Sequence, residues 1–156
     1  MMKRTNKRMA LCVTLLVLLL TFIWGNSLLP GEDSGALSGL VGQVLGTLLP
    51  FLDFSTQIGG FILRKFAHFS EFAALGMVLT WLFGMTQHKK CLLFALPVLC
   101  GTSAACIDET IQIFSPDRHA SLVDVSIDST GVLTGTLVLT GLWALCRIWK
   151  EKSRMH

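Results

Sequence analysis

The sequence predicts an all-α protein, a membrane-embedded bundle of four transmembrane helices with a further amphipathic or re-entrant helix on the outer side. Composition is the first reason, because 52% of the 156 residues are hydrophobic and only 15% are charged, which is typical of integral membrane proteins. Hydropathy patterning is the second, because four apolar segments approach the roughly 20 helical residues that cross a bilayer core. The length predicts a single domain, residues 1–156.

The first spanning helix is predicted at about residues 9–25, directly after the basic N-terminus MMKRTNKR. A basic start followed by an apolar run is also the pattern of a signal peptide. However, residues 23–27, I-W-G-N-S, are a poor match to the small-x-small pattern of a cleavage site. We therefore expect this helix to be retained.

An amphipathic helix is predicted next, at about residues 36–49. Its leucines and valines recur at i, i+3, i+4 and i+7, while serine, glycine and glutamine occupy the opposite face. The segment is too short and too rich in glycine to cross a membrane, and Pro50 ends it. We place it at the outer interface or as a partly re-entrant segment. Gly59-Gly60 then predicts a hinge.

Three more spanning helices complete the bundle. They are expected at about residues 66–84, 91–114 and 122–149. Pro97 predicts a kink in the second of these, and a turn at residues 115–118 ends it. Ser121 with Asp124 three residues later matches a capping box, which predicts the start of the last helix.

The distribution of positive charge predicts the orientation of the bundle. Ten of the 13 Lys and Arg residues lie in the N-terminus, the loop at residues 87–90 and the C-terminal tail. The other three, and nine of the ten acidic residues, lie on or near the opposite side. The positive-inside rule therefore predicts that both termini are cytoplasmic and that the acidic side is outermost.

Nine ionisable residues and one glutamine gather near the outer ends of three predicted helices, although a charge at the centre of a membrane helix costs about 2.5–3.5 kcal/mol. We call this set the polar cluster; it comprises Arg64, Lys65, His68, Glu71, Asp108, Glu109, Gln112, Arg118, Asp124 and Asp128. Glu71 and Asp128 lie about two turns inside their helices, so we expect both to point into the bundle. Gly131 and Gly135 continue the stripe of Asp128 and should let a neighbouring helix approach closely.

Two stretches of this cluster resemble signatures of the VanZ-like family. Residues 64–76, R-K-x-x-H-F-x-E-F-x-x-x-G, are similar to the first signature. Residues 108–135, D-E-x-x-Q-x-F-x-P-x-R-x-x-S-x-x-D-x-x-x-D-x-x-G-x-x-x-G, are similar to the second. The segment Ser27-Leu28-Leu29-Pro30-Gly31 also resembles Gram-positive members. The resemblance covers nearly the whole chain.

The chain departs from the family pattern at three positions. Phe72 replaces a common Tyr, Asp117 a common Gly, and Asp128 a common Asn. The resemblance implies a small multi-pass protein of the bacterial plasma membrane, in a family named after a protein linked to resistance to teicoplanin-type glycopeptides. It implies no particular reaction, and Asp128 puts any role that needs a neutral amide in doubt.

Three interpretations of the polar cluster remain open. In the first, Arg64, Lys65 and Arg118 bind an anionic or lipid-linked envelope component at the outer leaflet, because Arg binds phosphate or carboxylate bidentately. The remaining binding residues would be Glu109, Gln112, Asp124 and Asp128. This would modulate susceptibility to teicoplanin-type antibiotics.

In the second interpretation, the protein is a membrane-embedded enzyme. His68, Glu71 and Asp108 would then act as acid and base on an envelope lipid or a peptidoglycan precursor. The third interpretation is structural: polar pairs order the helices, and Arg118 forms ion pairs with Asp124 or Glu109.

Other classes are disfavoured by the sequence. His68, Glu71, Asp108 and Asp128 carry suitable ligand atoms, but no H-E-x-x-H or similar spacing occurs, so no metal site and no cofactor are expected. The five cysteines form no C-x-x-C pair. No nucleic-acid partner is expected, because the basic clusters sit where topology requires them. The absence of an inverted repeat argues against a transporter. Membrane lipids are the expected partners, and the oligomeric state is left open.

Overall fold

The computed structural model describes residues 2–30, 57–87, 89–116 and 118–153. Within this part of the chain, all the regular secondary structure is helical, and each helix contains a stretch long and apolar enough to cross a membrane. The helices are α1 (Met2–Ser27), α3 (Gln57–Thr86), α4 (Lys90–Gln112) and α5 (Leu122–Lys152). The all-α class and the four spanning helices predicted from the sequence are therefore confirmed. The amphipathic helix expected at residues 36–49 lies outside the described residues.

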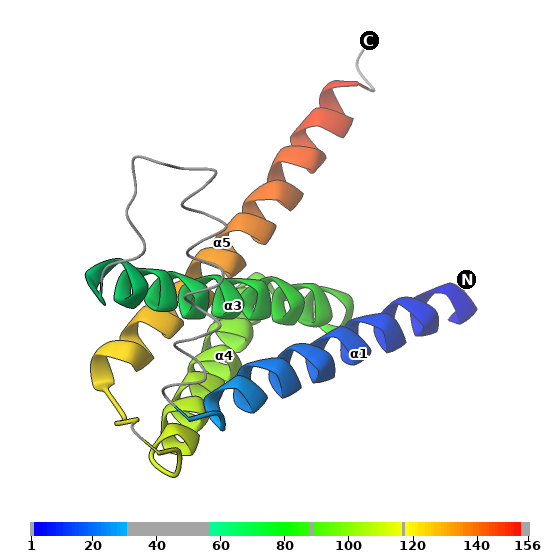
Figure 1. Ribbon diagram of the computed structural model, residues 1–156. Coiled ribbons are helices and arrows are strands. Elements are labelled where there is room, and N and C mark those ends of the chain that lie inside the picture. Colours follow the sequence, from blue (N-terminus) through cyan, green and yellow to red (C-terminus); the bar gives the residue numbers. More distant parts are fainter. Residues whose placement is uncertain (1, 31–56, 88, 117, 154–156) are drawn as a thin grey trace, which may run out of the picture.

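Helix α3 is the centre of the bundle, because it packs against α1, α4 and α5 (Figure 1). A small apolar core joins the helices, consisting of Ile23, Phe72, Leu75, Leu79, Ala104, Ala105 and Val132. Many large apolar side chains, such as Leu18 and Ile148, instead point away from the protein. An exposed apolar surface of this kind suits helices surrounded by lipid.

Glycines bring α3 and α5 into backbone contact. A Cβ added to Gly135 would lie 1.9 Å from the carbonyl oxygen of Ala73, and one added to Gly131 would lie 2.4 Å from that of Phe69. From the other side, a Cβ on Gly76 would lie 2.3 Å from the carbonyl oxygen of Val132. The predicted close approach along the glycine stripe is confirmed, and α3 is the neighbour that makes it.

The predicted hinge at Gly59-Gly60 is wrong, because both glycines lie inside α3, which begins at Gln57 rather than at about residue 66. A glycine weakens a helix by about 1 kcal/mol relative to alanine. In an apolar surrounding, however, the backbone must satisfy its hydrogen bonds internally, and a helix does so most completely. The longer helix carries Arg64 and Lys65 within it instead of placing them before its start.

The turn that ends α4 is confirmed. Backbone N–H groups of Phe114, Ser115 and Arg118 donate to the carbonyl oxygens three residues earlier. These bonds reverse the chain between α4 and α5 and place Arg118 beside both helices.

Candidate functional site

In one part of the polar cluster, hydrogen bonds connect the end of α1 with the end of α4. The Asp108 side chain is fully buried; Ser27 Oγ donates to its Oδ1 at 2.7 Å, and Gln112 Nε2 donates to its Oδ2 at 3.0 Å. Ser115 Oγ donates to the carbonyl oxygen of Ser27 at 2.7 Å. We call Ser27, Asp108, Gln112 and Ser115 the hydrogen-bonded half. It fixes the end of α1 against the end of α4.

The opposite part of the cluster, between α3 and α5, contains buried polar atoms that have no partner in the described part of the chain. Among the described residues, His68 Nδ1, Glu71 Oε2 and both carboxylate oxygens of Asp128 are buried and form no hydrogen bond. Asp128 is only 1% exposed. We call His68, Glu71 and Asp128 the unpaired half. Buried polar groups in proteins are usually hydrogen-bonded, so a concentration of exceptions points to a functional role.

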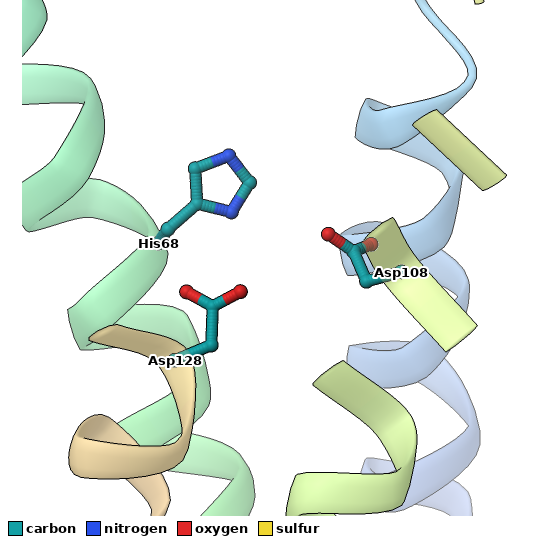
Figure 2. A group of neighbouring side chains, drawn as sticks. All are labelled: His68, Asp108 and Asp128. Carbon is teal, nitrogen blue, oxygen red and sulfur yellow. The ribbon is translucent and has the colours of Figure 1, made fainter. Parts of the chain in front are cut away.

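The two halves meet at three side chains (Figure 2). His68 from α3 and Asp128 from α5 lie next to each other, and the Asp108 carboxylate is directed toward them from α4. One nitrogen or oxygen atom from each of the three lies within 4.8 Å of those of the other two. An imidazole and two carboxylates therefore share one buried space at the junction of three helices.

A cavity of about 500 Å³ opens beside this junction. Its polar lining comprises Arg64, Lys65, His68, Gln112, Arg118, His119, Ser121 and Asp124, and its apolar lining comprises Phe61, Val123 and Ile127. Three cationic side chains and one carboxylate face it, so its charge is net positive. We refer to it as the cationic cavity.

Arg118 is the most constrained of the three cations. Its side chain is 9% exposed, and its Nε and Nη2 atoms are buried without a partner among the described residues. Burial, followed by the positive charge of Arg64, lowers the pKa of the Arg118 guanidinium from its ordinary value. The group remains charged at neutral pH, because an arginine pKa begins above 12.

Comparison with known proteins decides the family. The model of the family described as VanZ/LLP1 matches residues 12–146. The chain belongs to the VanZ/LLP1 family. Among curated proteins and among solved structures, no significant match is found. With four apolar helices of spanning length, this is a VanZ/LLP1-family protein of the membrane, and the matched residues include the whole polar cluster.

In this VanZ/LLP1-family chain, the ion pairs expected of Arg118 with Asp124 or Glu109 are wrong. Lys65 forms the ion pair with Asp124 instead. Glu109 Oε2 accepts the backbone N–H of Ser121 at 2.7 Å. Both acids are therefore engaged elsewhere, which leaves the Arg118 guanidinium facing the cavity.

The capping box predicted at the start of α5 is only half right. Ser121 is the N-cap residue, with extended backbone angles, but its side chain makes no capping hydrogen bond. In a capping box, the acid three residues later accepts the N-cap N–H. Here Glu109 of α4 accepts it, because Asp124 is paired with Lys65. The start of α5 is thereby tied to the end of α4.

Most of the polar cluster expected from the sequence converges in space. Arg64, Lys65, His68, Gln112, Arg118 and Asp124 line the cationic cavity, and Asp108 and Asp128 lie beside His68. Glu71 and Glu109 are buried or partly buried behind this surface rather than among its lining residues. Helices α3, α4 and α5 contribute to the polar layer as expected, and α1 adds Ser27 to it. Its place in a family-like segment was the only signal for Ser27, and no sequence signal marks Ser115.

Proposed function

We propose that this VanZ/LLP1-family protein binds an anionic headgroup, of a lipid or of a lipid-linked envelope component, in the cationic cavity. The observation that carries the proposal is Arg118, a buried guanidinium with two nitrogens that have no partner among the described residues. A buried donor without an acceptor costs about 1–3 kcal/mol, and more when it is charged. A phosphate or carboxylate in the cavity would accept from Arg118 and remove this cost.

The remaining lining supports a ligand that is partly apolar. Arg64 and Lys65 add positive charge, while Phe61, Val123 and Ile127 supply an apolar wall. Ligand pockets in proteins measure roughly 300–1,000 Å³, and the cavity of about 500 Å³ falls within that range. A headgroup with the beginning of its hydrocarbon chain fits both the chemistry and the size.

Affinity for an anionic headgroup tests the proposal directly. The purified protein in a neutral detergent is titrated with short-chain phosphatidylglycerol, with phosphatidylcholine as the neutral comparison. Arg118→Gln should weaken phosphatidylglycerol binding at least about tenfold, equivalent to 1.4 kcal/mol. Arg118→Lys should recover part of it, because the charge remains and the bidentate geometry is lost. The matched control is Arg147→Gln, at the exposed end of α5. Equal affinity of Arg118→Gln and Arg147→Gln would exclude the cationic cavity as the binding site.

The proposal includes an orientation: both termini lie in the cytoplasm, and the cavity opens at the outer leaflet of a bacterial plasma membrane. The positive-inside count supports it. Cysteine placed at the exposed position His119, in a variant without the native cysteines, should react with a membrane-impermeant maleimide added to intact cells. Labelling only after the cells are opened would reverse the orientation.

Binding of a surface component would modulate susceptibility to teicoplanin-type glycopeptides, which act at the outer face of the membrane. Cells that carry the protein should tolerate more teicoplanin than cells without it, and Arg118→Gln should remove the difference. Immunoblotting must show equal accumulation of the variant in the membrane. An unchanged inhibitory concentration with and without the native chain would reject this role and leave the headgroup-binding proposal intact.

A second candidate function is catalysis on an envelope lipid or peptidoglycan precursor. One observation favours it: His68 lines the cationic cavity and also lies beside Asp108 and Asp128, so a general acid or base could reach a bound headgroup. Lipid analysis of cells with and without the chain should then reveal a changed envelope component. Glu71→Gln and Asp108→Asn should abolish that change. If both variants retain it in full, these carboxylates do not catalyse the reaction.

A further inference from the structure

We propose that His68, Asp108 and Asp128 bind one divalent transition-metal ion at the junction of α3, α4 and α5. Each residue comes from a different helix, and their candidate ligand atoms lie within 4.8 Å of one another (Figure 2). Sequence spacing argues against such a site, because the three ligands are 40 and 20 positions apart along the chain and form no paired-ligand motif. The proposal does not depend on what occupies the cationic cavity.

Asp128 is the strongest argument for a cation. Its side chain is 1% exposed, and neither carboxylate oxygen accepts a hydrogen bond from any described residue. Asp108, which is fully buried, faces it. Two carboxylates in one dry space repel each other when ionised, and a buried charge is stable only when it is paired or coordinates a metal. A divalent cation would balance both carboxylates.

The hydrogen bonds to Asp108 resemble those that orient a metal-binding carboxylate. Ser27 Oγ donates to one carboxylate oxygen and Gln112 Nε2 to the other, so the group is held in a fixed orientation. A carboxylate has about four acceptor positions, so these two bonds leave room for a metal. Metal-binding carboxylates are commonly hydrogen-bonded in this way. The hydrogen-bonded half would thereby orient one ligand of the site.

The ligand chemistry indicates the class of metal. One imidazole nitrogen with two carboxylate oxygens suits Zn²⁺ or Mn²⁺, whereas Ca²⁺ and Mg²⁺ prefer oxygen alone. Zinc bonds of about 2.0–2.2 Å would place tetrahedral ligand atoms about 3.4 Å apart. Closing from the observed spread of at most 4.8 Å brings the widest pair of ligand atoms closer by up to about 1.4 Å, which side-chain rotation can supply. Three protein ligands leave a position open for water or another donor.

Protons are the competing occupants, since two carboxylic acids can neutralise the same space without any metal. A measurement of the bound metal distinguishes a metal-occupied site from a protonated one. The protein is purified in detergent without chelator or affinity metal, supplied with one equivalent of Zn²⁺ or Mn²⁺, dialysed and measured by mass spectrometry. We expect about one ion per chain for at least one of the two metals. Retention of neither metal would overturn the proposal.

Variants locate the bound ion. Asp128→Asn and His68→Gln should each lower the affinity at least tenfold, read by calorimetry and by the visible spectrum of the Co²⁺ form. The matched controls are Asp124→Asn, one turn away on α5, and His119→Ala on the loop; both should keep the ion. If Asp128→Asn fails to accumulate, His68→Gln carries the test alone. Equal affinity and an unchanged Co²⁺ spectrum in both Asp128→Asn and His68→Gln would overturn the site.

Discussion

Each half of the polar cluster contains one buried aspartate, yet the two halves differ in how that carboxylate is satisfied. In the hydrogen-bonded half, Asp108 accepts from Ser27 and Gln112 and is fully buried. In the unpaired half, Asp128 is equally buried but accepts from no described residue. Burial alone therefore does not tell a hydrogen-bonded carboxylate from one without a partner among the described residues.

This difference in hydrogen bonding predicts that the two halves contribute differently to stability. The hydrogen-bonded half joins α1 to α4, and the Asp108 carboxylate finds its hydrogen-bond donors within it. The unpaired half lies where glycines bring α3 and α5 together, and its polar atoms have no protein partner within the described chain. Losing a bond in the first half should destabilise the protein, whereas neutralising a group in the second should not.

The largest effect is expected from Gly135→Val. The new side chain would meet the Ala73 backbone, and backbone cannot move aside as a flexible side chain can. We expect unfolding in detergent to become easier by about 3 kcal/mol or more, at or above the upper end for overpacking. Gly141→Val is the control, since a Cβ added there would meet no atom of another described helix within 4 Å. Similar melting temperatures for the two variants would show that the α3–α5 contact is not tight.

Ser27→Ala should have the next largest effect. It removes the donor to Asp108 and leaves a buried carboxylate oxygen without that bond, which costs about 1–3 kcal/mol. Ser103→Ala is the matched control, because its exposed hydroxyl bonds only to the Leu99 carbonyl of its own helix. Chemical denaturation of both variants measures the difference. Indistinguishable stabilities would mean that the hydrogen-bonded half does not hold α1 in place.

Asp128→Asn tests the contrast most directly. In metal-free protein it breaks no hydrogen bond within the described chain and removes an unpaired buried acid, so stability should stay the same or rise by about 1 kcal/mol. Asp108→Asn should instead destabilise, because an amide nitrogen cannot accept from Ser27 or Gln112. Thermal unfolding of both in the presence of chelator decides between them. A similar loss in the two variants would erase the distinction between the halves.

The smallest effect is expected from Lys65→Met. The ion pair between Lys65 and Asp124 is about one-fifth exposed on each side, and such pairs contribute about 0–1 kcal/mol. Its contribution should shrink further in high salt. Melting curves in low and high salt measure it. A loss of stability above about 2 kcal/mol would contradict the assignment of this pair as a weak, partly exposed ion pair.

Much of the fold could be read from the sequence because membranes restrict it. Long apolar runs must be helices, and the stripe from Asp128 to Gly135 indicated a tight helix contact in advance. Helix ends were less predictable, as the extension of α3 through Gly59-Gly60 shows. In an apolar surrounding, glycine is a weak signal of a helix end, because the backbone there must keep its internal hydrogen bonds.

The site was predicted as a set of residues but not as a set of partners. Sequence spacing placed His68 and Glu71 on one face, yet it could not show that Asp124 pairs with Lys65 rather than Arg118. Which side chains pair depends on distances between helices, and the spacing of residues along one helix does not give those distances. The same reason explains why Ser27, far from Asp108 along the chain, was missed as its donor.

The exposed C-terminal end of α5 bears on how deep the polar cluster lies in the bilayer. Figure 1 shows this end of the helix extending beyond its neighbours, and residues 141–150 are exposed. With a rise of 1.5 Å per residue, the basic side chain of Lys150 lies about 33 Å along the helix axis from Asp128. A bilayer's hydrocarbon core is about 30 Å thick. If Lys150 rests among the headgroups of one leaflet, α5 acts as a ruler that holds Asp128 near the opposite water boundary, within reach of ions and headgroups there.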